Sequence, residues 1–238
     1  MDFSLLVPTR NRPNNIVRFV ESVAETSSDE STIEILFYVD ADDENTKNAT
    51  EAIEDIIENK PNIKYSMMGD SVDWYNKWWN YLWQHCSGKY IMQCGDDLIF
   101  RTDNWDVEIK KSFNQYPDPF VVIYCDDGSD DAEDRATHPV LSKEWCDELG
   151  YFVPGKFLGA YNDTWITEVA QYANRFHYVP HVLIEHMHPD FKKSEIDEVY
   201  SKQIDMVHVQ NAGQVFKDTK QERINDSNKI INKIRDKQ

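Results

Sequence analysis

The residues of this chain best suited to chemistry are two adjacent aspartates, Asp96 and Asp97. An apolar run, Tyr90–Met92, precedes them, and a second, Leu98–Phe100, follows at once. This pattern is typical of a buried strand that delivers two carboxylates to a sheet edge. Such carboxylates repel each other and lose solvation, so they share a proton or hold a cation. We favour Mg²⁺ or Mn²⁺, which prefer oxygen ligands, over the alternative of a simple Gly-Asp-Asp turn.

The composition indicates one ordinary globular domain, because 40% of the 238 residues are hydrophobic and 13% are aromatic. The net charge of −18 argues against loose binding to nucleic acid, which needs a basic surface. An acidic chain binds a phosphorylated compound most easily through a divalent ion. The sequence has neither a signal-peptide pattern nor an apolar run near the roughly 18 residues of a membrane span, so we expect a cytoplasmic protein without membrane contact. The four cysteines form no CxxC pair and are expected to be free thiols.

Apolar periodicity predicts that strands alternate with helices from the start of the chain. The predicted strand, helix, strand and helix lie in turn over Phe3–Val7, Pro13–Thr26, Ile33–Val39 and Ala49–Ile57. Strands joined by a helical crossover are parallel neighbours, and ligands bind such sheets at the carboxyl ends of the strands. This rule places Arg10 and Asp40 at a binding site. Further on, an aromatic-rich segment, Asp73–Trp83, predicts a buried helix with Asn76 among its polar members.

The second half of the chain supplies further polar candidates. A strand is expected over Phe120–Tyr124, and a helix over Ser142–Leu149 ends at Gly150. Asp163 opens a later helix, where an aspartate can be a general base, the helix N-cap or both. His186 and His188 are two apart in a predicted strand, Val182–Pro189, and so face the same side. One of them is a candidate metal ligand, and the alternative is a structural or acceptor-facing histidine.

These motifs together resemble a known family. A strand followed by PTRNRP, a helix, a strand ending in Asp40, an Asn-bearing helix and a GKYI strand ending in Asp96-Asp97 is similar to the N-terminal half of an inverting, family 2-like glycosyltransferase of the GT-A fold. The resemblance covers residues 3–100 and continues more loosely to about residue 200. It implies an α/β fold with a single mixed, mainly parallel central sheet flanked by helices. The Glu-His-x-His-Pro run at residues 185–189 resembles a phage-type subset.

The resemblance also implies roles for individual residues. The donor is a nucleotide-diphospho sugar, expected to be a UDP-sugar, and the aspartate pair matches a DXD-type motif in which Cys94 replaces the commoner first acid. Asp97 contacts the divalent ion, with His186 or His188 completing its shell, and Asp163 is the base. Donor-binding residues by this resemblance are Pro8, Thr9, Arg10, Asp40, Asn76 and Asp96, of which Asp40 contacts the base ring and Asp96 the ribose.

We therefore expect a GT-A domain over residues 1–200, with a nucleotide-binding half (1–100) and an acceptor half (101–200), and a helical C-terminal extension over 201–238. The expected function is metal-dependent glycosyl transfer to an acceptor hydroxyl, inverting with Asp163 as base. Two alternatives remain: a nucleotidyltransferase, which the absence of glycine in PTRNRP disfavours, and a non-catalytic acidic binding module. The phage-like ending would place the protein in a host cytoplasm with a modified DNA base as acceptor, which the charge disfavours.

Overall fold

One eight-stranded sheet forms the centre of the computed structural model, which describes residues 1–69 and 77–237. Its strand order is β3-β2-β1-β4-β7-β6-β8-β5. The strands are β1 (Phe3–Thr9), β2 (Ile33–Val39), β3 (Ile63–Met68), β4 (Tyr90–Gln93), β5 (Leu98–Phe100), β6 (Val122–Asp126), β7 (Val140–Ser142) and β8 (Phe176–His186). Only β7 and β5 run antiparallel to their neighbours among these strands. The predicted single, mainly parallel sheet is confirmed.

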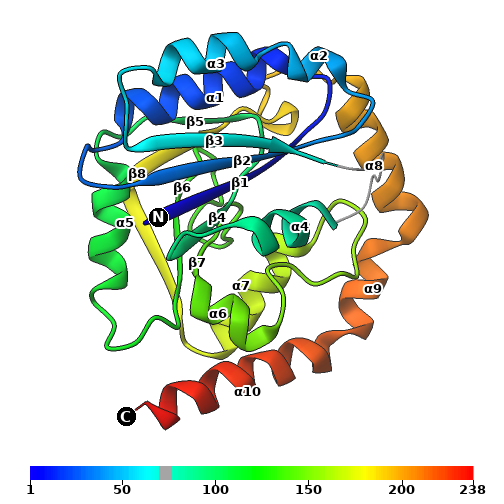
Figure 1. Cartoon of the computed structure of the whole chain (residues 1–238). Helices are drawn as coiled ribbons and strands as arrows, with labels where there is room; N and C mark the ends of the chain where they lie inside the picture. Colours follow the sequence, from blue (N-terminus) through cyan, green and yellow to red (C-terminus); the bar gives the residue numbers. More distant parts are fainter. Residues whose placement is uncertain (70–76, 238) are drawn as a thin grey trace.

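Helices cover both faces of the sheet (Figure 1). They are α1 (Pro13–Thr26), α2 (Glu44–Lys47), α3 (Thr50–Ile57), α4 (Lys77–His85), α5 (Trp105–Phe113), α6 (Lys143–Leu149), α7 (Asn162–Tyr172), α8 (Glu198–Gln210), α9 (Ala212–Asp218) and α10 (Lys220–Asp236), with a 3₁₀ turn η1 (Pro189–Phe191). Figure 1 shows α1, α2 and α3 over one face and α4, α6 and α7 over the other. Helices α8 and α9 descend one side of the molecule to α10, which crosses below α6 and α7.

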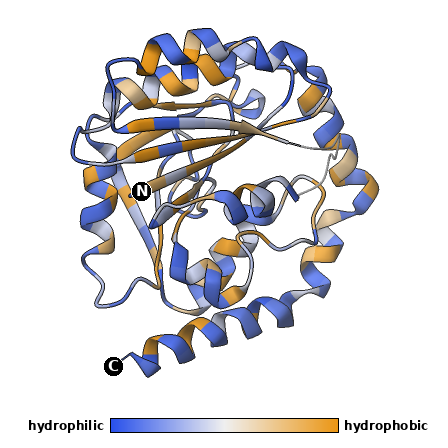
Figure 2. Cartoon of the chain, in the orientation of Figure 1, coloured by the Kyte–Doolittle hydropathy of each residue, from blue (hydrophilic) through white to orange (hydrophobic). Residues whose placement is uncertain are grey.

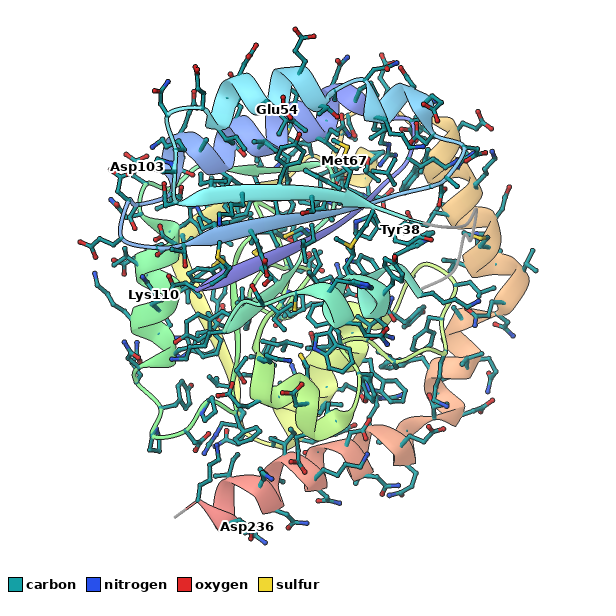
Figure 3. All side chains as sticks on the ribbon, viewed as in Figure 1. Tyr38, Glu54, Met67, Asp103, Lys110 and Asp236 are labelled. Carbon is teal, nitrogen blue, oxygen red and sulfur yellow. The ribbon has the colours of Figure 1, made fainter. Side chains whose placement is uncertain are left out.

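Apolar side chains form one core on each face of the sheet. On the first face, Phe19 of α1 and Trp105 of α5 are fully buried against alternate residues of β1 and β2. The second core joins Trp145 of α6 and Trp165 of α7 to the sheet. Tyr38, labelled in Figure 3, belongs to this second core and packs edge-on against Tyr81 of α4, with ring centroids 5.5 Å apart. The alternation of buried residues between two faces is the period-2 pattern of strands.

The C-terminal helices pack on the same domain. Figure 2 shows α10 as mostly hydrophilic with apolar residues interspersed, and two of these, Ile230 and Ile234, are buried in the second core. Arg223 of α10 is only 1% exposed; its Nε donates to Glu168 of α7 at 2.6 Å, and its guanidinium lies 3.6 Å from the ring centre of Phe216. The predicted boundary at residue 200 falls inside α8. In the described residues we find no helix of the length and apolarity that crossing a membrane requires.

Strand β8 lies between β6 and β5, next to the turn that carries Asp96 and Asp97. It pairs in parallel with β6 and antiparallel with β5, where Leu98 is opposite His186. The pairing with β6 shifts register between Cys125 and Asp126, so that Asp126 is opposite Leu183. This irregularity bends the strand and brings its end back to the aspartate turn.

Most predicted elements are found at their expected positions, with boundary differences. Helix α6 is capped by Ser142 and ends at Gly150 in the left-handed region, with φ of 82°, as expected. Strand β6 begins at Val122 and strand β8 at Phe176, which is earlier than the predicted start at Val182. The four cysteines are free thiols.

Candidate active site

A cavity of about 580 Å³ opens at the carboxyl ends of β1, β2 and β4. The start of α7, the end of β8 and helix α8 complete its walls. Every described residue that the sequence predicts for the site lines this cavity: Pro8, Thr9, Arg10, Asp40, Asp96, Asp97, Asp163, His186 and His188. Asn76 lies outside the described residues. The fold therefore gathers at one place side chains that are far apart in the sequence.

Asp96 is fixed by two hydrogen bonds, one from the end of β1 and one from the loop that follows it. Thr9 Oγ1 donates to its Oδ2 at 2.7 Å, and Arg12 Nη1 donates to its Oδ1 at 2.9 Å. The side chain is 4% exposed, and this burial, reinforced by the charge of Asp97, raises its pKa against the opposing effects of Arg12 and Thr9. Asp96 therefore holds the loop after β1 in place at the base of the cavity.

Asp97 lies beside His186, with 3.4 Å between its Oδ2 and the imidazole Nε2. The strand pairing explains the contact, since His186 is opposite Leu98 and the Met187 amide donates to the Asp97 carbonyl at 2.9 Å. Burial raises the pKa of Asp97, but hydrogen bonding and positive charge from His186 outweigh it and hold the pKa well below the usual value. Asp97 is therefore an anion with one histidine partner.

Gly95 leaves room for the Asp97 side chain. A Cβ added at Gly95 would lie 2.4 Å from Asp97 Oδ1, closer than any van der Waals contact. The carboxylate of Asp97 thus lies over the Cα of Gly95, and any larger residue there would force this carboxylate to move.

The two histidines of the predicted metal site are in different situations. Their ring centroids are 4.7 Å apart, as expected for residues on one face of a strand. His188 Nδ1, however, accepts a hydrogen bond from the Asp190 amide at 3.3 Å and caps η1. Of the two, His186 is the one in polar contact with Asp97.

The donor set fits a divalent cation shared with a ligand. In the parts of the chain that the structure describes, no group of three or more His, Cys, Asp or Glu side chains is arranged to hold a metal ion. Asp97 and His186 offer one carboxylate and one imidazole, and both line the cavity with side chains 17% and 12% exposed. A diphosphate would supply the remaining oxygen ligands.

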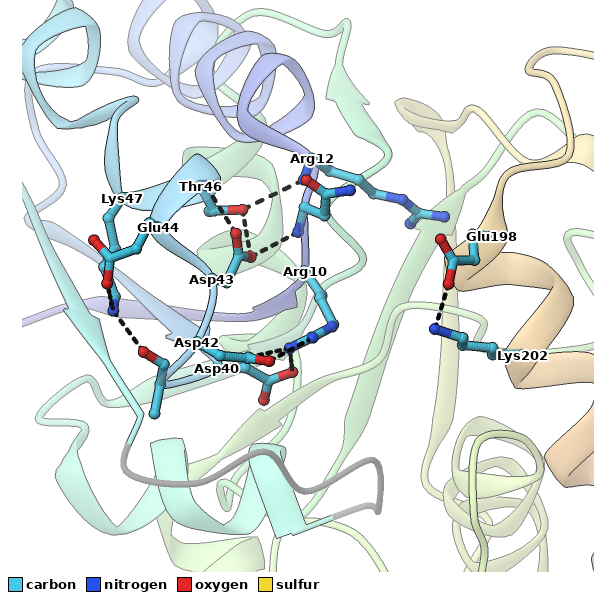
Figure 4. A network of polar contacts seen from close by, with 12 residues as sticks. Arg10, Arg12, Asp40, Asp42, Asp43, Glu44, Thr46, Lys47, Glu198 and Lys202 are labelled. Carbon is cyan, nitrogen blue, oxygen red and sulfur yellow. Dashed lines mark hydrogen bonds and ion pairs between the residues drawn. The ribbon is translucent and has the colours of Figure 1, made fainter.

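Arg10 joins the loops that follow β1 and β2. Its guanidinium donates to Asp40 at 2.7 Å and to both oxygens of Asp42 at 2.6 and 2.9 Å (Figure 4). Burial raises the pKa of Asp40, against the opposing effect of Arg10. In the same loop, the amide of Asn11 donates to Asp43 at 2.6 Å. These contacts fix the position of Asp40 at the edge of the cavity.

Asp163 approaches the cavity from the first turn of α7. The N-cap of this helix is Tyr161, which has a φ of 70°, so the alternative reading of Asp163 as N-cap is wrong. Arg135 Nε lies 3.7 Å from Asp163 Oδ2, and the Asp163 side chain is 20% exposed. Burial raises the pKa of Asp163, while Arg135 opposes the shift. A carboxylate of raised pKa that reaches a cavity is suited to accept a proton.

The polar residues of this cavity that the sequence did not assign to the site include Arg12, Arg135, His138 and Asp197. Arg12 lies between Asp96 and Asp197, and Figure 4 shows its side chain directed toward α8. A second arginine in PTRNRP was the available signal. His138 packs edge-on against His186, with ring centroids 4.6 Å apart, and burial together with the charge of His186 lowers its pKa to about 3. A lone histidine after an acidic loop carries no sequence signal for this contact.

The eight-stranded sheet and the helices on both of its faces have the GT-A fold, which is shared by the glycosyltransferase structures described below. Residues 4–112 match the model of the family described as glycosyl transferase family 2, which confirms the family 2-like resemblance over that part of the chain. A comparison with curated proteins found no match. The phage-type subset stays a prediction.

Solved structures with the same fold include three glycosyltransferases. TarS 1–349 from S. aureus has a TM-score of 0.59 and 15% identity, covering 88% of this chain and 65% of that one. The mannosyltransferase PcManGT from Pyrobaculum calidifontis, in complex with GDP-Man and Mn²⁺, has a TM-score of 0.61 and 13% identity, covering 96% and 73%. GalNAc-T7 with UDP, GalNAc and Mn²⁺ has a TM-score of 0.62 and 13% identity, covering 78% and 44%. The chain spans 36% of the longer TarS structure.

Proposed function

We propose that this protein is a metal-dependent glycosyltransferase that moves a sugar from a nucleotide-diphospho sugar to an acceptor hydroxyl. One observation carries the proposal: the Asp97–His186 pair lines the same cavity as Asp163, although Asp97 comes from the first half of the chain and the other two residues from the second. Such a reaction needs a site for the leaving diphosphate and a base for the acceptor. The family match over residues 4–112 supports it, as do neighbours solved with UDP-GlcNAc or with GDP-Man and Mn²⁺.

The donor nucleotide would bind along the loops after β1 and β2. Pro8, Thr9 and Arg10 line this side, and Asp40 is held there by Arg10 for contact with the base ring. Asp96 would accept from the ribose while keeping its loop contacts. A UDP-sugar is the expected donor. A divalent cation would offset the repulsion between the diphosphate and the carboxylate of Asp97.

Transfer would be a single displacement with inversion. The acceptor oxygen forms a bond to the anomeric carbon as the bond from that carbon to the diphosphate oxygen breaks, and its electron pair stays on the diphosphate. The acceptor proton passes to an Asp163 carboxylate oxygen. When bound at Asp97 and His186, the cation supplies Lewis-acid stabilisation for the negative charge on the leaving group.

The test is calorimetry with UDP, GDP, CDP and TDP, with and without Mn²⁺ or Mg²⁺, on the wild type and Asp97→Asn. We expect one nucleotide to bind only with the metal, and this binding to be lost in the variant. Asp236→Asn is the matched control, since Asp236 is exposed at the far end of α10 (Figure 3). The absence of nucleotide binding in every metal would contradict the proposal. Once the donor is identified, NMR of the anomeric configuration of the product tests inversion. Release of pyrophosphate during the reaction would instead indicate a nucleotidyltransferase.

A further inference from the structure

Four consecutive residues, Arg135–His138, connect the two ends of the candidate active site. At one end, Arg135 Nε lies 3.7 Å from the carboxylate of Asp163. At the other, the His138 ring packs edge-on on His186, which in turn contacts Asp97. Arg135, Thr137 and His138 all line the cavity. The segment therefore runs along the cavity wall from the base to the acid that faces the leaving group.

The geometry of glycosyl transfer indicates which part of the donor lies beside residues 135–138. In the donor, the sugar is bonded through its anomeric carbon to the diphosphate, and the attacking hydroxyl approaches that carbon from the side of the base. With the diphosphate at Asp97 and the base at Asp163, the sugar ring occupies the space between them. This is the space that the 135–138 segment borders.

His138 has the hydrogen-bonding capacity to contact that sugar. Both of its ring nitrogens are buried, and neither has a hydrogen-bond partner within the described chain. The Gln93 backbone is its polar neighbour and favours the protonated ring, but no contact between them has hydrogen-bond geometry. A neutral imidazole carries one donor and one acceptor, and leaving both buried and unpaired is costly. A hydroxyl group both donates and accepts, so it complements either nitrogen.

We infer that His138 is a specificity-determining residue that hydrogen-bonds a hydroxyl of the donor's sugar, with the 135–138 segment as the wall of the sugar subsite. The inference rests on the proposed function and narrows its substrate class. The accepted donors are nucleotide-diphospho sugars with a free hydroxyl at the position facing His138. A donor that is deoxygenated there loses the contact and leaves the imidazole unpaired.

The test separates the sugar from the rest of the donor. Calorimetry compares the affinity of the nucleoside diphosphate with that of its nucleotide sugar, in the presence of Mn²⁺, for the wild type, His138→Phe and His138→Gln. The phenylalanine keeps a ring against His186 without hydrogen bonds, and the glutamine keeps a donor and an acceptor without the ring. His181→Gln is the control, because the His181 side chain is 63% exposed and does not line the cavity.

In the wild type the nucleotide sugar should bind more tightly than the diphosphate. His138→Phe should lower the affinity for the nucleotide sugar by about tenfold, which is the effect of losing one hydrogen bond to a buried group, and leave the affinity for the diphosphate unchanged. His138→Gln should restore part of the gain. For the wild type, removing the sugar hydroxyl at one ring position, and at no other, should lower donor affinity by about tenfold. For His138→Phe, the same deoxy donor should bind as tightly as the normal donor.

Two results would overturn the inference while leaving the proposed function intact. One is an equal loss of affinity for the diphosphate and the nucleotide sugar in His138→Phe, which would show that the imidazole supports binding of the metal or the nucleotide rather than the sugar. The other is no loss for either ligand. Failure of the wild type to bind any nucleotide would instead overturn the proposed function, and this inference with it.

Discussion

Arg12 and Asp197 form a two-pronged ion pair, in which Nε and Nη2 each donate to one carboxylate oxygen at 2.7 Å. The pair joins the loop after β1 to the N-cap residue of α8, a helix with no fully buried side chain. Asp197 also caps α8 by accepting from the Tyr200 amide at 2.8 Å. One carboxylate thus both begins the helix and attaches it to the donor side of the cavity.

Removing that carboxylate should loosen α8. In Asp197→Ala, amides of residues 199–204 should exchange with solvent about fivefold faster, since the loss of an N-cap costs about 1 kcal/mol. Asp197→Asn keeps a good cap and removes only the charge, so its exchange rates separate the ion pair from the cap. Hydrogen–deuterium exchange with mass spectrometry measures both variants. Unchanged exchange in Asp197→Ala would show that other contacts hold the helix.

Gly95→Ala should displace the Asp97 carboxylate, because the new Cβ would lie 2.4 Å from Oδ1. We expect the Kd of Mn²⁺ with nucleotide to rise by about tenfold or more, as when a ligand's support is disturbed. Gly155→Ala is the matched control, since a Cβ there meets no atom within 4 Å. Equal affinity in the two variants, measured by calorimetry, would contradict the position of Asp97 described above.

Asp163→Asn should lower the transfer rate by about 10²–10⁴-fold and leave donor binding intact, as expected for a general base. The pH profile gives a second test. The base acts only when it is deprotonated, and burial raises the pKa of Asp163 above the ordinary aspartate value of 3.8. As the pH is lowered, activity should therefore begin to fall at a pH above 3.8. Arg135→Gln removes the opposing charge and should move this acidic limb of kcat/KM further upward. A limb unmoved by Arg135→Gln would assign the titration to another group.

Arg223→Met should destabilise the fold rather than impair binding. The substitution removes the half-buried ion pair with Glu168 and leaves Phe216 without its cation, which together should cost about 2 kcal/mol. Urea denaturation measures the change in the free energy of unfolding. Arg235→Met, at an exposed position of the same helix, should change it by less than about 0.5 kcal/mol. Comparable effects of the two would mean that Arg223 is not a structural anchor.

The order of elements and the acids of the site could be predicted because their signals are local. Apolar runs ending in charged residues identify β2 with Asp40 and β4 with the Asp96-Asp97 pair. What sequence could not supply is pairing between distant segments. The contact of His186, rather than His188, with Asp97 follows from the antiparallel register that sets Leu98 opposite His186. His138 enters the site only because β7 runs beside β4 in the sheet, and a single sequence contains no trace of either pairing.

Strand β8 also sets the order in which the molecule can be completed. It is the last strand along the chain, yet it lies inside the sheet between β6 and β5, and it is the partner of β5 among the described strands. A growing chain that stops short of β8 therefore has β5 without a partner and β6 with an open edge, and such edges favour aggregation. Asp97 acquires His186 as its neighbour only once the chain has been synthesised through β8. The contact between Asp97 and His186 therefore forms late in folding, and no fragment that ends before β8 can contain it.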